Sequence, residues 1–201
     1  MTAADVIDAL AVTADPRRVA RRFTDLPRHE LDTLLWSEVP EHRLAALLVM
    51  TMQPLTAELV EDYLAAARAE RIDSVELVDA SAESLLGAWL ADRPRNVLFS
   101  LAKSDLVWER RIAMVATLHF LRNDDDSTTL EIAEKLVRER QEPIQQAVGW
   151  LLREVGKRVS RDHLLEFLDR NAGRMPRTML AYATEHLDAS LRERYRQVPR
   201  T

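Results

Sequence analysis

The sequence predicts an all-α protein. Glycine is scarce, at 4 of 201 residues, and aromatic residues make up only 5% of the chain. Sheets are richer in aromatic and β-branched residues, and their turns are richer in glycine. No useful length of alternating apolar and polar residues occurs, whereas apolar residues recur at spacings of three and four, as in amphipathic helices. The length suits one domain with a sizeable core, so we expect a single domain over residues 1–201.

Two helix starts are indicated early in the chain. Asp15 precedes Pro16, which is typical of an N-cap followed by proline at the first helical position. Val39 and Pro40 predict the same kind of start for the segment EHRLAALLVMTM. Both segments are therefore expected to be helices that begin at the proline.

Further helices are expected in the second half of the chain. The segment WERRIAMVATLHFL carries its apolar residues at helical spacing. Ser127 or Thr128 is placed to cap the segment TTLEIAEKLVRER, and Glu131 stands where a capping box would need it.

The helical segments also repeat. RLAALL, RIAMVA, QQAVGW and MLAYAT each place a small alanine in apolar surroundings, and these alanines are 68, 34 and 34 residues apart. A period of about 34 residues indicates stacked helix pairs, in which small residues let neighbouring helices approach closely. The signature WxxLGxxY is absent, so HEAT-like pairs fit better. We therefore expect an α-solenoid of about six HEAT-like helix pairs, stacked into a curved superhelix. The four alanines are Ala45, Ala113, Ala147 and Ala181.

Asp79 stands where this period predicts another small residue. It lies among apolar residues in the stretch VELVDASAESLLG. An unpaired buried carboxylate costs several kcal/mol or becomes protonated. Asp79 is therefore expected either to cap the following helix, SAESLLGAWL, or to face a cleft that needs a negative charge.

Composition excludes several classes of protein. The chain has no cysteine, and its five histidines show no metal-ligand spacing, so we expect no metal and no cofactor. The N-terminus lacks a basic start, and no apolar run reaches ~18 residues, so we expect a cytoplasmic protein without a membrane span. Nothing in the sequence indicates an oligomer, and a monomer is expected.

The charge is unevenly distributed along the chain. Residues 1–100 hold 10 Lys and Arg against 17 Asp and Glu, whereas residues 101–201 hold 18 against 16, which gives net charges of −7 and +2. A polyanion such as DNA is therefore expected to meet the second half. The alternative from charge alone is an ordinary mixed, solvated surface.

Two segments in that half carry candidate binding residues, DLVWERR and AVGWLLREVGKR. Each also has an ordinary structural explanation, since tryptophans often lie in the core and Arg111 could pair with Glu109. The candidates are Trp108, Arg110, Arg111, Trp150, Arg153, Lys157 and Arg158.

These segments resemble the DNA alkylation repair family typified by AlkD, the HEAT-like-repeat DNA glycosylases. The resemblance extends from about Asp25 to Leu187. It rests on the block WxRRxA with AxGWxLRExGK, on PRTML, and on ELVDASA as the acid-bearing segment. It implies binding to double-stranded DNA and excision of alkylated purines, such as 3-methyladenine and 7-methylguanine, without a metal.

The resemblance also implies roles for single residues. Asp79 would stabilise the positive charge that grows on the deoxyribose as the glycosidic bond breaks. Trp150 would pack on the DNA at the lesion, and Arg111 would contact the backbone beside it. Val75 holds the place of an aromatic wall. The other residues implied to contact the DNA backbone are Arg110, Arg153, Lys157 and Arg177.

The chain departs from the family pattern at three positions. Val75 stands where the family has tryptophan, Gln146 where it has a basic residue, and Ala181 where it has arginine. Two other functions therefore stay open: a non-catalytic relative that binds damaged or branched DNA, and a protein-binding helical-repeat scaffold.

Overall fold

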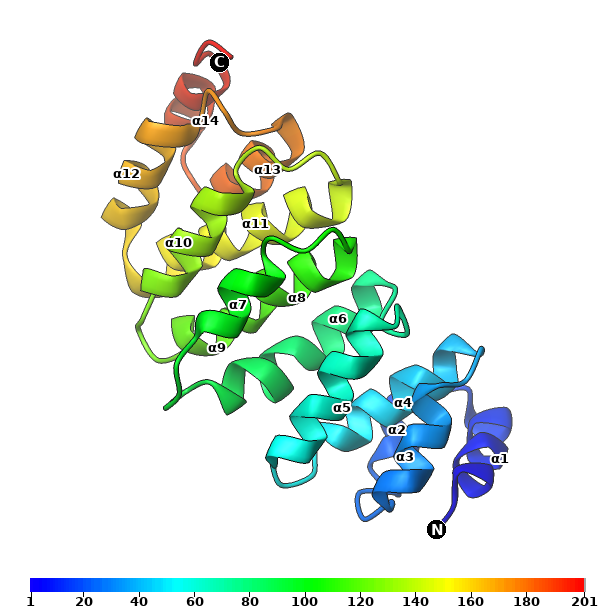
Figure 1. The fold of residues 1–201 in the computed structure, drawn as a ribbon. Coiled ribbons are helices and arrows are strands. Elements are labelled where there is room, and N and C mark those ends of the chain that lie inside the picture. The colour runs from blue at the N-terminus through cyan, green and yellow to red at the C-terminus, as the bar shows by residue number, and fades with distance from the viewer. Residues whose placement is uncertain (201) are drawn as a thin grey trace. The chain divides into compact units, whose positions relative to one another are not determined.

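The computed structural model describes residues 1–200 of the chain. Within that range all regular elements are helices and none is a strand, which confirms the all-α prediction (Figure 1). The chain forms two compact units, Met1–Trp89 and Leu90–Thr201, and each is described by itself. The expectation of one domain, and of one curved superhelix, concerns both units together and stays a prediction.

The first unit is built from helix pairs. Helix α3 packs on α4, α5 lies beside α3, and α4 packs on α6, the second helix of the next pair. Helices α1 and α2 cover the free side of α4. The elements are α1 (Ala3–Thr13), α2 (Pro16–Ala20), α3 (Arg28–Leu35), α4 (Pro40–Met50), α5 (Ala57–Arg68), α6 (Val75–Ala82) and the π-helical η1 (Glu83–Gly87).

The second unit continues the same arrangement. Helix α8 packs on α11 and α11 packs on α13, so the second helices of successive pairs form one row (Figure 1). Helices α7 and α10 each lie against the second helix of their own pair. The elements are α7 (Asn96–Leu101), α8 (Val107–Ala116), α9 (Leu118–Leu121), α10 (Ser127–Leu136), α11 (Glu142–Glu154), the π-helical η2 (Val155–Val159), α12 (Arg161–Asn171), α13 (Arg177–Thr184) and α14 (Ala189–Arg196).

Both proline-linked helix starts are confirmed. Asp15 is the N-cap of α2, and its carboxylate accepts the backbone N–H groups of Arg17 and Arg18. Helix α4 begins at Pro40 after Val39. Proline has no N–H to satisfy and its φ angle is already helical, so these starts are fixed locally.

The predicted cap of α10 is wrong. The N-cap is Asp126, it makes no side-chain cap bond, and neither Ser127 nor Thr128 caps the helix. Asp125 explains the shift, because its carboxylate accepts both the backbone N–H and the hydroxyl of Ser127, at 3.0 and 2.6 Å. No capping box with Glu131 forms, since that motif needs a capping hydroxyl at the N-cap.

A recurring polar clamp holds the loops that lead into the second helices. The residue four places after the N-cap donates from one nitrogen to two successive carbonyls of the loop before it. Arg43 does this in α4, at 2.9 and 3.2 Å, and Arg110 in α8, at 2.8 and 3.0 Å. Gln145 does the same in α11, at 3.0 and 3.1 Å.

The two arginine clamps also join successive pairs. Arg43 binds both carboxylate oxygens of Asp73, at 2.9 and 3.0 Å, and Arg110 binds Glu139 at 2.7 Å. Each acid lies about one repeat further along the chain. Charge-assisted bonds of this kind are stronger and more directional than neutral ones.

The repeat register differs from a strict period of 34. The N-caps of the second helices are 35, 32, 35 and 35 residues apart. In each second helix, the residue seven positions after the N-cap is compact and buried, and it lets the neighbouring helices approach. These residues are Ala46, Ser81, Ala113, Val148 and Ala183. Ala45 and Ala147 are buried as predicted, but Ala181 is exposed, so its predicted place in the core is wrong. Asp79 does not replace a small core residue, because Ser81 fills that place.

Candidate functional site

Asp79 is an exposed residue in the middle of α6. The N-cap of this helix is Ser74, whose hydroxyl accepts the N–H of Leu77 at 3.3 Å. The expectation that Asp79 caps the following helix is therefore wrong. Val75 lies one turn before Asp79 and is 37% exposed, so an aliphatic side chain and a carboxylate share the exposed side of α6.

The surroundings of Asp79 are tied into the core of the first unit. Tyr63, fully buried on α5, lies 3.3 Å from the hydroxyl of Ser81, which donates to the carbonyl of Leu77 at 2.7 Å. Burial raises the pKa of Tyr63, and the negative charge of Asp79 raises that pKa further. The charge of Asp79 is therefore felt by Tyr63, whose position is fixed in the core of the unit.

Both α6 and α11 change into a π-helical turn just beyond a predicted site residue. The turn η1 begins four residues after Asp79, and η2 begins five residues after Trp150. Single π turns inside helices are rare and occur frequently at functional sites.

None of the four tryptophans lies in the core. Trp150 and Trp108 are partly exposed, as is Trp89, and Trp36 is 45% exposed. Trp108 and Trp150 are thus not fully buried, and each keeps part of its side chain open to solvent. An aromatic ring that keeps one face open can pack on a ligand.

Gly149 explains why glycine precedes Trp150. A Cβ atom there would lie 2.4 Å from the carbonyl oxygen of Met179 and 2.6 Å from the Cβ of Tyr182. Both obstacles belong to α13, so the glycine lets α11 and α13 pack closely and fixes the part of α11 that carries Trp150.

Arg111 is buried rather than displayed on the surface. Only 3% of it is exposed, and its guanidinium donates to the carbonyl oxygen of Pro143 in α11. This bond joins α8 to α11. Arg110, the neighbouring candidate, forms the clamp described above.

The remaining cationic candidates are partly or fully exposed in the second unit, and Arg158 among them pairs with Glu154 at 2.6 Å. Arg153 pairs with Glu154 at 3.3 Å and with Glu185. Lys157 and Arg177 are both exposed, and within residues 1–200 neither has an ion-pair partner.

His186 lies beside several of these cations. Burial lowers its pKa, and the positive charges of Lys157, Arg153 and Arg161 lower that pKa further. An anion bound at these cations would offset their positive charge and so raise the pKa of His186.

A basic cleft in the second unit was missed by the sequence analysis. Its cavity of about 490 Å³ lies between the loop after α7 and the loop before α11. Among its charged lining residues the only acid is Glu139, and Arg110 already neutralises it. Charge runs alone could not reveal this cleft, because its cations come from separate parts of the chain: the loop after α7, helix α8, the end of α10 and the loop before α11. They are Lys103, Arg110, Lys135, Arg138 and Arg140.

Two predicted site residues share one register position with two of the positions at which the chain departs from the family pattern. Five places after the N-cap stand Asp79 in the first unit and, in the second, Arg111, Gln146 and Ala181. The last three follow one another on the contacting helices α8, α11 and α13. The structure thus gives these residues equivalent places in their repeats, with Asp79 and Val75 in one unit and the others in the second.

Two features of other classes of protein are absent from residues 1–200. No helix there combines the length and apolar character needed to cross a bilayer. No cluster of three or more His, Asp or Glu side chains in that range is placed to hold a metal ion.

Comparison with known proteins identifies the family. No curated protein sequence matches the chain. The sequence model of a family described as DNA alkylation repair enzyme matches residues 10–187, close to the range of the resemblance seen in the motifs. The match covers most of the helix pairs and both segments that carry the candidate residues. The chain therefore belongs to the DNA alkylation repair enzyme family.

Proposed function

We propose that the protein excises alkylated purines such as 3-methyladenine and 7-methylguanine from double-stranded DNA, with Asp79 as the electrostatic catalyst. The observation that carries this proposal is the exposed carboxylate of Asp79 on α6. An alkylated purine is a cationic base, so its glycosidic bond is already weak. A fixed carboxylate lowers the energy of the positive sugar that forms as the bond breaks.

The chemistry needs no metal or cofactor. The leaving base is already positively charged, so it departs without being protonated first. A water molecule oriented by the carboxylate then attacks the anomeric carbon of the sugar, and the carboxylate accepts the proton that this water loses. Asp79 has the two properties this step needs: a negative charge open to solvent, and a helix that holds it in place.

Contact with the DNA backbone is assigned to the second unit. That unit holds 20 Lys and Arg against 17 Asp and Glu, whereas the first holds 8 against 16. Exposed Lys157 and Arg177, together with the basic cleft, supply cations for phosphates. Trp150 supplies an aromatic surface, and Arg153 and Arg110 support the backbone contact.

The burial of Arg111 favours a second function, binding of damaged or branched DNA without excision. Its guanidinium is already bonded to a carbonyl of α11, and Val75 offers no aromatic wall beside Asp79. Binding would then persist while base release is absent.

Base release from methylated duplex DNA separates these functions. The variant Asp79→Asn removes the charge and keeps the size of the side chain. Glu76→Gln is the matched control, because Glu76 is an exposed carboxylate on the same helix. We expect Asp79→Asn alone to lose release at unchanged DNA affinity. Equal release by wild type and both variants would remove Asp79 from the mechanism, and binding without release by wild type would establish the second function.

A further inference from the structure

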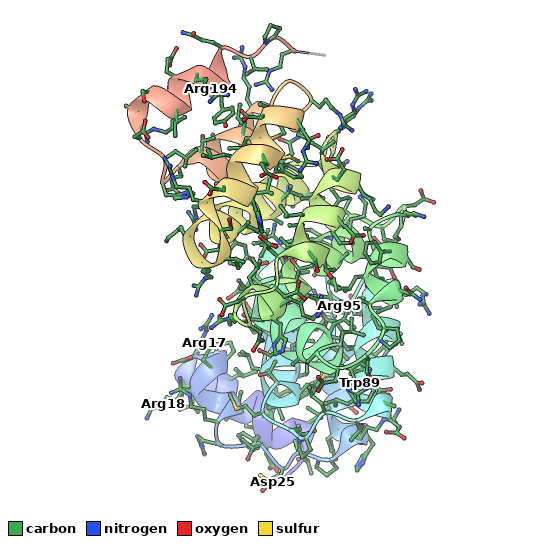
Figure 2. All side chains as sticks on the ribbon, turned by 90° about the vertical axis from the view of Figure 1, so that its left-hand side faces the viewer. Arg17, Arg18, Asp25, Trp89, Arg95 and Arg194 are labelled. Atoms are coloured by element: carbon green, nitrogen blue, oxygen red, sulfur yellow. The ribbon has the colours of Figure 1, made fainter. Side chains whose placement is uncertain are left out.

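Four arginines follow one another closely at α2 in the first unit, in the stretch PRRVARR. We call Arg17, Arg18, Arg21 and Arg22 the arginine cluster. All four are exposed, and Figure 2 shows Arg17 and Arg18 at an outer edge of their unit. No acidic side chain within residues 1–200 forms an ion pair with any of them; Asp15 accepts only backbone N–H groups here.

The other arginines of this unit are all engaged. Arg28 pairs with an acid at 2.5 Å, Arg43 at 2.9 Å and Arg71 at 2.8 Å, and Arg68 also has a partner. The unit contains no lysine. Every uncompensated positive side chain of this otherwise acidic unit is therefore gathered within six residues.

The cluster works against the stability of its own segment. Arg17 and Arg21 are four residues apart, and so are Arg18 and Arg22. Only Arg17 and Arg18 lie on α2, which ends at Ala20, and Arg21 and Arg22 lie in the turn that follows, but like charges gathered within six residues repel each other all the same. Asp15 accepts the backbone N–H groups of Arg17 and Arg18 and forms no ion pair with the side chain of either. Such a group is retained at a cost in stability, which is typical of a binding surface.

We infer that the arginine cluster binds the phosphates of duplex DNA. The stretch from Arg17 to Arg22 takes in most of α2 and the turn that follows it. At the rise of a helix it would extend over about 7.5 Å, and a duplex carries one charge per about 1.7 Å of its axis, so roughly four phosphates fall within that length. The guanidinium fork suits phosphate oxygens better than an ammonium does, and all four cations are arginines.

An anionic membrane surface fits the cluster less well. Helices that lie on membranes present an exposed apolar face beside their cationic one. The apolar residues here are Val19, Ala20 and Phe23, and all three are buried in the first unit. The inference rests on the DNA binding proposed above but not on base excision.

The test is the salt dependence of binding to unmodified duplex. A plot of the logarithm of affinity against the logarithm of salt concentration has a negative slope, and each phosphate contact contributes about 0.9 to it. We expect Arg17→Gln with Arg21→Gln to reduce this slope by about 1–2 and to weaken binding at low salt. The matched control is Arg28→Gln with Arg71→Gln, which removes two ion-paired arginines of the same unit and should leave the slope unchanged.

The melting temperature shows whether unfolding of the variant, rather than loss of phosphate contacts, weakens DNA binding. The cluster variant should melt at or above the temperature of wild type, because a like-charge pair has been removed. An unchanged slope in the cluster variant, or an equal loss in the control, would overturn the inference. Loss of binding to phosphatidylserine vesicles with an unchanged DNA slope would overturn it as well. Since unmodified duplex is used, an absence of base release leaves this test intact.

Discussion

Replacement of Gly149 by alanine tests whether α11 is held by close contact with α13. The new Cβ would lie 2.4 Å from the carbonyl oxygen of Met179, whereas ordinary contact begins at 3.4 Å, so α13 must move by about 1 Å. Alanine favours the helix by about 1 kcal/mol over glycine, and overpacking typically costs about 1–3 kcal/mol. Because the obstacle is backbone, we expect a clash in the upper part of that range, about 2–3 kcal/mol, and therefore a net loss of about 1–2 kcal/mol.

Thermal unfolding followed by circular dichroism measures this effect. For a chain of this size the loss corresponds to a decrease in Tm of roughly 2–8 °C. Gly156→Ala is the graded control: its Cβ would meet Leu164 Cδ2 at 2.5 Å and His186 Nε2 at 3.0 Å, both at the ends of side chains that can rotate. If Gly149→Ala melts at or above the temperature of wild type, or if Gly156→Ala is the more damaging change, the packing account of α11 fails.

Three further predictions concern packing, protonation and specificity. Ala147→Leu should lose about 1–3 kcal/mol of unfolding free energy through overpacking, whereas Ala181→Leu, on the surface, should be nearly neutral; equal melting curves would refute the corrected register. Binding of DNA phosphates near Lys157 should raise the pKa of His186, because the phosphates offset the positive charges that lower that pKa. The affinity for DNA should therefore increase as the pH falls and His186 takes up a proton. Proton NMR titration of the ring with and without duplex measures it, and an unchanged pKa would exclude phosphate from these cations. Val75→Trp should increase release of 7-methylguanine by supplying an aromatic wall beside the lesion; unchanged release would show that no wall is needed there.

The sequence predicted the helical class and the proline-linked starts because these depend on neighbouring residues alone. The cap of α10 was missed, since Asp125 competes for the groups of Ser127. The exact register was missed because one repeat is 32 residues long and the others 35. A period of 34 also falls one residue short of each 35-residue repeat, so from Ala113 to Ala181 the mismatch reaches two residues, which moves Ala181 from the core to the surface.

The candidate site was predictable only as a set of residue types. Sequence motifs placed Asp79 and Trp150 but could not show that both are exposed to some degree, since exposure depends on packing. Nor could they show that Arg111 is buried against a carbonyl 32 residues away. The run PRRVARR was visible in the sequence, yet its lack of partners emerges only when the ion pairs of the other arginines are known.

The central claim is that the carboxylate of Asp79 stabilises the positive charge formed during base excision. The most direct measurement is the single-turnover rate of 7-methylguanine release from a methylated duplex, with enzyme in excess so that all DNA is bound. We expect Asp79→Asn to release base about 10²–10³ times more slowly than wild type, with equal DNA affinity and equal melting temperature. Equal rates for wild type and Asp79→Asn, or no release by wild type above that of uncatalysed DNA, would contradict the account.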